Sequence, residues 1–313
     1  MERVKDFDAF YDLKIQPILP QLKREGRRAK GSKILMVISG FLLIPSFVIY
    51  AADMEDGPGG WLPVIVAAVF VGCIFYSGYW GDKYEDDFKK KIIGEIIAYL
   101  HEGLLYKPDK YIPAKEYRSS GLFTRKYDHY SGSDYIRGIY KDISFHCSEL
   151  STAVHFRKNN SSDAEIFNGI FFAAAINSYF SGATYVWKKG ESQLPKSLAD
   201  QHFRVYPLPH VQAIHTPDEE FHKLYSVYST DAGEAGRILS PEMTHCMTAF
   251  RNQIQRDVVF SFVSGRCYVA INIDEDLLEP TGIAANREEV KEYFFAILLI
   301  LSIINQLPLK NLQ

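Results

Sequence analysis

Two long apolar runs near the N-terminus, residues 34–52 and 61–80, are the strongest hydrophobic pattern in the chain, and neither contains a charged side chain. At a rise of ~1.5 Å per residue, each run could cross a hydrocarbon core of ~30 Å as a helix. A signal peptide would have a shorter apolar region closer to the N-terminus; a buried core helix is the other alternative. Ala68 and Gly72 form a small-xxx-small pair that would let the first helix approach closely. We predict a transmembrane helical hairpin over residues 34–80.

The charges around these runs indicate how the hairpin is oriented. Residues 53–60, between the runs, carry three acids and no Lys or Arg. Basic residues flank the outer ends of both runs: Lys23, Arg24, Arg27, Arg28, Lys30 and Lys33 before the first, and Lys83, Lys89, Lys90 and Lys91 after the second. Because Lys and Arg favour the cytoplasmic side, we expect a multi-pass protein with its N- and C-termini in the cytoplasm and the lipid bilayer as its first partner.

The segments on either side of the hairpin show helical spacing. Residues 1–33 form a basic segment with an apolar face, which is interrupted at Pro17 and Pro20. Apolar positions over residues 82–105 predict a stalk helix that continues from the second run, since no proline interrupts it. We assign residues 81–313 to a cytoplasmic domain, long enough for one large core or two small ones.

After the stalk, the hydrophobic period changes from helical to strand-like. The clearest hairpin joins residues 258–263 to residues 266–273 through Ser264 and Gly265, a two-residue turn that suits tight hairpins. Ser240 caps a helix that begins at Pro241 and runs to about residue 255. Further strands are predicted over residues 143–156, 166–176, 184–187 and 224–228. Because strands and helices do not alternate regularly, we predict an α+β domain with a largely antiparallel sheet and flanking helices.

The C-terminal helix begins with a capping box, in which Asn286 is the cap and Glu289 follows three residues later. Its apolar stretch, residues 293–304, would span only ~18 Å as a helix, too little for a bilayer. A helix that is apolar all round is normally buried in a core. We predict a core helix; a membrane-surface or subunit contact is the alternative.

Composition and motifs argue against several functions. The net charge is -3, and no basic stripe marks a nucleic-acid partner. The four cysteines form no CxxC motif, which suits a reducing cytoplasm. The chain has no GxSxG elbow, phosphate-binding loop, dinucleotide fingerprint or HExxH motif, and its nine histidines are scattered. We therefore expect no metal site and no cofactor, and the missing catalytic signatures favour a non-enzymatic protein.

Several short segments hold more Gly, Ser, Asp and aromatic residues than packing requires. They are SGLF at residues 120–123, GSDYIRG at 132–138, FNGIF at 167–171 and VYSTDAGEA at 227–235, before LSP at 239–241. In these segments the chain resembles the bacterial membrane-protein family filed as domain of unknown function 3137. The resemblance covers most of the chain from about residue 80. It implies two N-terminal spans in a cell inner membrane, a GxDxIxG turn at residues 132–138, and no known activity. A LemA-type membrane protein is the partner that it suggests, beside self-association.

The same segments supply the candidate site residues. Asp134 and Asp231 are most simply turn-capping carboxylates, and Glu234 and Arg237 can pair at i, i+3. The functional hypothesis is that Asp134, Glu149, Asp231, Glu234 and Arg237 converge on one groove for a polar ligand.

The leading functional prediction is a membrane-anchored binding or assembly protein of unknown ligand, without enzymatic activity. A membrane-tethered hydrolase or transferase with an unrecognised carboxylate site is one alternative. A structural scaffold of a membrane complex is the other.

Overall fold

The structure, a computed structural model, describes residues 7–52, 61–154, 164–176, 180–190, 206–274, 277–280, 282 and 286–312. The chain forms two compact units. The first unit comprises Met1–Tyr99 and Leu278–Phe294, and the second comprises Leu100–Leu277 and Phe295–Gln313. The first unit extends past residue 81 to Tyr99, and the C-terminal helix contributes to both units. The predicted boundary between a membrane hairpin and a cytoplasmic domain stays a prediction. The predicted loop at residues 53–60 lies outside the described residues.

The first unit is built from helices. A short helix α1 (Phe7–Phe10) and a π-helical turn η1 (Tyr11–Ile15) precede α2 (Leu19–Ala52), which begins at the predicted proline interruption and contains Pro45. Helix α3 (Leu62–Phe88) continues through the π-helical turn η3 (Lys89–Ile93) into α4 (Gly94–Leu100). The stalk therefore ends at Leu100 and not at residue 105, since the chain turns at His101, whose carbonyl accepts from Leu104 N–H at 3.3 Å.

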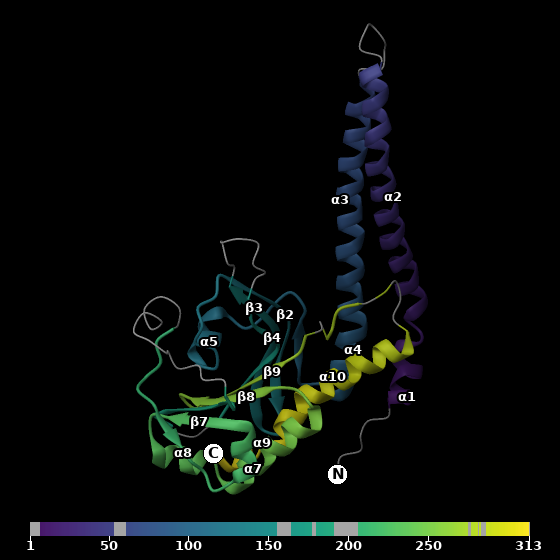
Figure 1. The fold of residues 1–313 in the computed structure, drawn as a ribbon. Helices are drawn as coiled ribbons and strands as arrows, with labels where there is room; N and C mark the ends of the chain where they lie inside the picture. The colour runs from purple at the N-terminus through teal and green to yellow at the C-terminus, as the bar shows by residue number, and fades with distance from the viewer. Residues whose placement is uncertain are drawn as a thin grey trace. The chain divides into compact units, whose positions relative to one another are not determined.

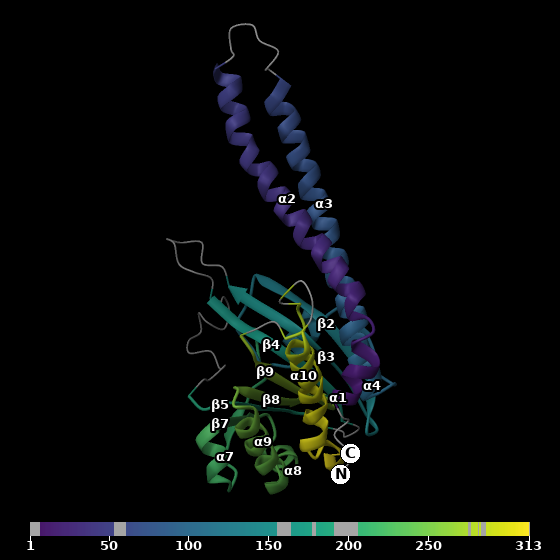
Figure 2. The ribbon, with the colours of Figure 1, turned by 90° about the vertical axis from the view of Figure 1, so that its right-hand side faces the viewer.

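Helices α2 and α3 lie side by side (Figures 1 and 2). Each contains a segment that is long and apolar enough to cross a membrane, and only 11% of each segment is buried. The seam of α2 carries buried serines at a seven-residue spacing, Ser32, Ser39 and Ser46, each of which donates to a carbonyl of its own helix at 2.8 Å. Ala68 and Gly72 are exposed, so the predicted small-residue pair does not form this contact. The side of α2 that is buried carries these three serines, one in each seven-residue repeat.

The second unit contains an antiparallel sheet, which confirms the predicted α+β class. Among the described residues its strand order is β1-β2-β3-β4-β9-β8-β5-β7-β6, and every pair is antiparallel. The strands are β1 (Leu105–Lys107), β2 (His129–Tyr140), β3 (Ile143–Val154), β4 (Ala164–Ala175), β5 (Ala183–Lys188), β6 (Gln212–Ile214), β7 (Tyr225–Ser229), β8 (Val258–Val263) and β9 (Arg266–Asn272). The hairpin through Ser264 and Gly265 is present as predicted.

Strand β2 corrects one prediction. The GxDxIxG segment was expected to form a turn capped by Asp134, but it lies in the middle of this long strand. The register with β3 shifts between Ser133 and Ile136, and Asp134 has a φ of 60°. A β-bulge and a turn favour the same kinds of residue. The local pattern therefore predicted a turn where a bulged strand forms.

Helices cover both faces of the sheet. Helix α5 (Ala114–Ser119) packs on one face, where Tyr117 lies against the β4 side chains Phe167 and Phe171. Helix α9 (Pro241–Ile254) and the part of α10 (Arg287–Gln306) in this unit lie on the opposite face (Figures 1 and 2). The remaining elements are α7 (Glu219–Leu224), α8 (Ala232–Ile238) and the 3-10 helix η4 (Leu309–Leu312). Alternate side chains of β4 point to opposite faces of the sheet. Because helices cover both faces, both sets of side chains are buried.

Helix α10 has the predicted capping box and a largely buried surface. Asn286 Oδ1 accepts from Glu289 N–H at 2.9 Å, and Glu289 Oε2 accepts from Asn286 N–H at 3.4 Å. Ile297 is 1% exposed, whereas Phe295 is 49% exposed. The core interpretation therefore holds for most of this helix, although one side of it faces outward.

Candidate functional site

A groove beside strand β6 is a candidate ligand site in the second unit. It has a volume of about 910 Å³, within the usual range of ligand sites. Strand β6 and residues 215–218 form one wall, and the opposite wall comes from α8 and the first turns of α9. Side chains cap the starts of α7, α8 and α9 around the groove. Asp218, Asp231 and Ser240 accept from the backbone N–H groups of Phe221, Glu234 and Met243, respectively.

Strand β6 is an edge of the sheet. Its residues Gln212, Ala213 and Ile214 pair with β7, and in the described part of the chain no strand pairs with its other side. Gln212 and Ala213 are exposed, and all three residues line the groove. An edge strand of this kind presents unpaired backbone N–H and C=O groups to a partner.

A few polar groups converge on the groove. Asp218 is half-buried, and the bond from Phe221 N–H lowers the pKa of its carboxyl, so the group is an anion at neutral pH. His215 lines the wall and stacks on His222, with ring centroids 4.5 Å apart. Burial, followed by the nearby His215, lowers the pKa of His222, whose Nε2 accepts from Thr216 N–H at 2.8 Å.

The predicted residues Asp231, Glu234 and Arg237 lie on or next to helix α8. Glu234 is 8% exposed, and its carboxylate accepts from Ser181 N–H at 3.1 Å, Ser181 Oγ at 2.9 Å and Gly182 N–H at 2.9 Å. Burial alone would raise the pKa of Glu234, but these backbone donors outweigh it and lower the pKa. The Glu234 carboxylate therefore holds the start of β5 against α8, and the Asp231 carboxylate caps α8 by accepting from Glu234 N–H at 2.8 Å. Arg237 is exposed, beside a groove-lining residue.

The other two predicted residues lie elsewhere in the sheet. Asp134 is buried in the β2 bulge and accepts from the Tyr106 hydroxyl. Glu149, on β3, accepts from Leu277 N–H at 3.0 Å. Between β3 and β7 stand β4, β9, β8 and β5, so at ~4.8 Å per strand the two groups are ~24 Å apart along the sheet. The structure brings Asp231 to Glu234 and places Asp134 and Glu149 on neighbouring strands, but it does not join the two pairs.

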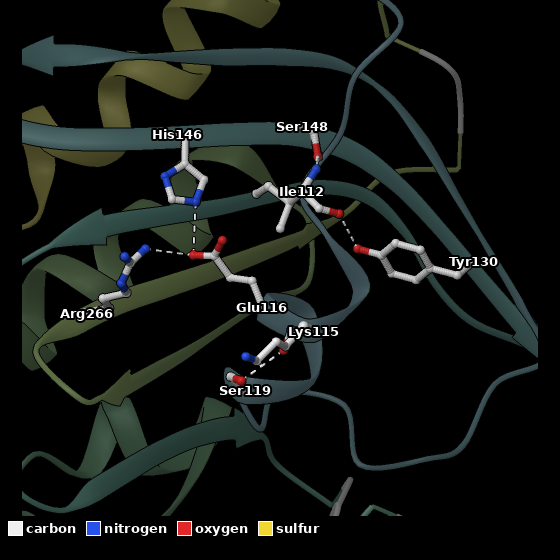
Figure 3. A network of polar contacts seen from close by, with 8 residues as sticks. All are labelled: Ile112, Lys115, Glu116, Ser119, Tyr130, His146, Ser148 and Arg266. Carbon is white, nitrogen blue, oxygen red and sulfur yellow. Dashed lines mark hydrogen bonds and ion pairs between the residues drawn. The ribbon is translucent and has the colours of Figure 1, made fainter.

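A second polar cluster fastens α5 to the sheet (Figure 3). Glu116 Oε1 lies 3.0 Å from His146 Nε2 on β3 and accepts from Arg266 Nη1 on β9 at 2.7 Å. Burial alone would raise the pKa of Glu116, but the contacts with His146 and Arg266 lower it. Close by, Ile112 N–H donates to Ser148 Oγ at 3.1 Å. The carboxylate is held as an anion between two cationic or polar partners, an arrangement suited to anchoring.

Sequence reasoning missed the β6 wall of the groove and this cluster. The partners of Glu116 are 30 and 150 residues away in the chain, and a local sequence motif cannot predict contacts over such separations. Local signals existed for one wall of the groove, since the segments at residues 227–235 and 239–241 contribute Ala232, Leu239 and Pro241 to its lining. Within the described ranges, no three His, Cys, Asp or Glu side chains come together as a possible metal site.

Comparison with known proteins adds a match to one family model over part of the chain. Residues 165–309 match the family model described as "Protein of unknown function (DUF3137)", which confirms the resemblance for that part of the chain. No curated protein matches the chain significantly. Among solved structures, the crystal structure of the mycobacterial trehalose monomycolate transport factor A, TtfA, matches with a TM-score of 0.33 and 11% sequence identity. That match covers 71% of this chain and 94% of the other.

Proposed function

We propose that this protein is a membrane-anchored binding protein whose groove receives an extended segment of a partner protein. The open edge of β6 beside the groove is the observation that carries the proposal. A partner strand that adds to β6 would gain main-chain hydrogen bonds, and its alternate side chains would enter the groove. The segment would carry apolar residues at alternate positions and a cationic or hydrogen-bond-donating group near Asp218.

The anchor in this proposal is the pair α2 and α3. Their apolar side chains are largely uncovered: Phe41 is 70% exposed and Phe75 is 73% exposed. A soluble core helix would bury such side chains, whereas a bilayer covers them. In this proposal both ends of the hairpin lie in the cytoplasm of a bacterial cell, at the inner membrane. The basic flanks of the apolar runs support the cytoplasmic ends, and the family resemblance supports the inner membrane. A LemA-type membrane protein and a second copy of this chain are the partners to test.

Site-specific photo-cross-linking tests the groove. A photoreactive amino acid replaces Gln212 in the full-length protein in cells, and the cross-linked partner peptide is sequenced. The matched control places the same amino acid at Ala249, which is exposed on α9 outside the groove. We expect one predominant peptide at Gln212 that is missing at Ala249.

A synthetic copy of that peptide is then titrated against detergent-solubilised protein. Gly236 lines the groove, and a Cβ there would meet open space, so Gly236→Trp adds a large side chain at the groove without a clash at its Cβ. We expect Gly236→Trp to abolish binding and Ala249→Trp to leave it unchanged. The peptide should also slow hydrogen exchange at residues 212–214. Equal binding to both variants, or unchanged exchange in β6, would contradict strand addition.

A further inference from the structure

A second pocket, in the first unit, lies between α2, α3 and the segment around Glu279. Its volume is about 630 Å³. Tyr84 Oη donates to Gly282 O at 3.0 Å and thereby holds the segment around Glu279, which forms the third wall of the pocket, against α3. Part of the hollow exists because α3 has glycines here. A Cβ at Gly78 or Gly81 would meet nothing within 4 Å.

The pocket changes character along its length. Met36 and Ile74 line one end, and both lie inside the apolar runs. Toward the other end, α2 contributes Lys30 and Lys33, and α3 contributes Asp82. The pocket therefore crosses the level at which the apolar runs give way to charged residues. An amphiphile at a membrane surface has the same change of polarity.

The pocket has positive charges on one helix and a negative charge on the other. Lys30 and Lys33 are neighbours at i, i+3 on one helix, they are exposed, and within the described residues neither has an ion-pair partner. The buried Lys89 neutralises the other acids of the lining, since it lies 3.7 Å from Glu85 and contacts Glu279. Two cations on α2 and the Asp82 carboxylate on α3 therefore remain for a ligand.

We propose that this pocket binds the headgroup of a phospholipid that carries both a phosphate and a primary ammonium group, as phosphatidylethanolamine does. The proposal rests on the proposed membrane insertion but concerns a different site from the groove. Lys30 and Lys33 hold the phosphate through charge-assisted hydrogen bonds, and Asp82 accepts from the ammonium group. The acyl chains leave past Met36 and Ile74.

The charge arrangement distinguishes this lipid from its common neighbours. Phosphatidylglycerol has the phosphate but an uncharged glycerol in place of the ammonium group, so Asp82 would accept from a neutral hydroxyl and would lose the ion pair. Phosphatidylcholine has a quaternary ammonium group, which has no N–H to donate to Asp82. The pocket therefore prefers phosphatidylethanolamine to both.

Native mass spectrometry of the full-length protein in detergent tests the preference, with each of the three lipids added separately. We expect Lys30→Gln/Lys33→Gln to lower retention of phosphatidylethanolamine by about tenfold, as the loss of charge-assisted bonds predicts. Asp82→Asn should remove the preference over phosphatidylglycerol. Gly78→Leu should lower retention by filling the hollow.

Each variant has a matched control outside the pocket. Lys23→Gln/Arg24→Gln changes the same charge on exposed positions of α2, and Gly72→Leu makes the same replacement at another open position of α3. Equal retention of the three lipids by the wild-type protein, or equal losses in variants and controls, overturns the proposal. Resistance of the wild-type chain to alkaline carbonate extraction reports membrane insertion separately. A failure of insertion is thereby distinguished from a failure of the lipid site.

Discussion

Gly182 shows how a single residue supports the contacts of α8. Its N–H donates to Glu234, and a Cβ at this position would lie 2.5 Å from Thr230 Oγ1 and 2.8 Å from Glu234 Oε2. We expect Gly182→Ala to displace a buried carboxylate from its donors and to destabilise the protein by about 1–3 kcal/mol. Thermal unfolding in detergent measures the loss. Gly236→Ala, on open helix surface, should be neutral or stabilising, and an equal loss there would contradict the argument.

His222 gives the second unit a pH dependence. Burial and His215 lower its pKa in the folded state, so the unfolded chain binds a proton at a higher pH than the folded chain does. Stability is therefore complete above the ordinary histidine pKa of about 6.5 and falls as pH drops below it. Denaturant unfolding at about pH 8 and pH 5.5 should show this loss. His222→Gln, which keeps an acceptor for Thr216 N–H, should reduce it; an unchanged pH slope would contradict the assignment.

Individual residues were predictable where their partners are local. Ser240 and Asn286 cap their helices as expected, because a cap bonds to a backbone group three residues away. Glu234 was noticed, but its donors at Ser181 and Gly182 lie some fifty residues earlier in the chain. No spacing rule reaches that far, so its supporting role needed the structure.

Helices and strands, like single residues, were predictable only where their contacts are local in the sequence. The β8–β9 hairpin was predictable because its turn and both strands are contiguous. The pairing of β5 with β8 joins strands that are more than seventy residues apart, and it places β6 at the edge. Strand β6 itself has only three residues, too few for an alternating pattern. The groove depends on both facts, which explains why the sequence did not reveal it.

Helix α10 offers a prediction at the scale of one element. Ile297 is buried and Phe295 is half-exposed on the same helix. We expect Ile297→Ala to cost about 2–4 kcal/mol through a core cavity, whereas Phe295→Ala should cost much less. Chemical unfolding of the two variants compares them directly. Similar costs at both positions would mean that the outer side of α10 is covered in solution by the bilayer or by another subunit.

The organisation of the whole molecule was only partly predictable from its sequence. The two long apolar helices and the sheet were expected, and both are present. The division into units was not expected, because Leu278–Phe294 belongs with the N-terminal helices. Hydrophobic patterns mark elements, but they do not show which distant segments share a core.

The charge pattern predicts the topology of the whole molecule. In a background without the native cysteines, a cysteine at Gly57 tests the loop between the apolar runs, which lies outside the described residues. A second, at Glu219, tests the exposed surface of α7. Because the basic flanks favour the cytoplasm, a membrane-impermeant thiol reagent should label the Gly57→Cys variant in intact spheroplasts. It should label Glu219→Cys only after lysis, and lysed samples of both variants control for reactivity. The reverse pattern, or labelling of both positions from outside, would rule out a hairpin with cytoplasmic ends.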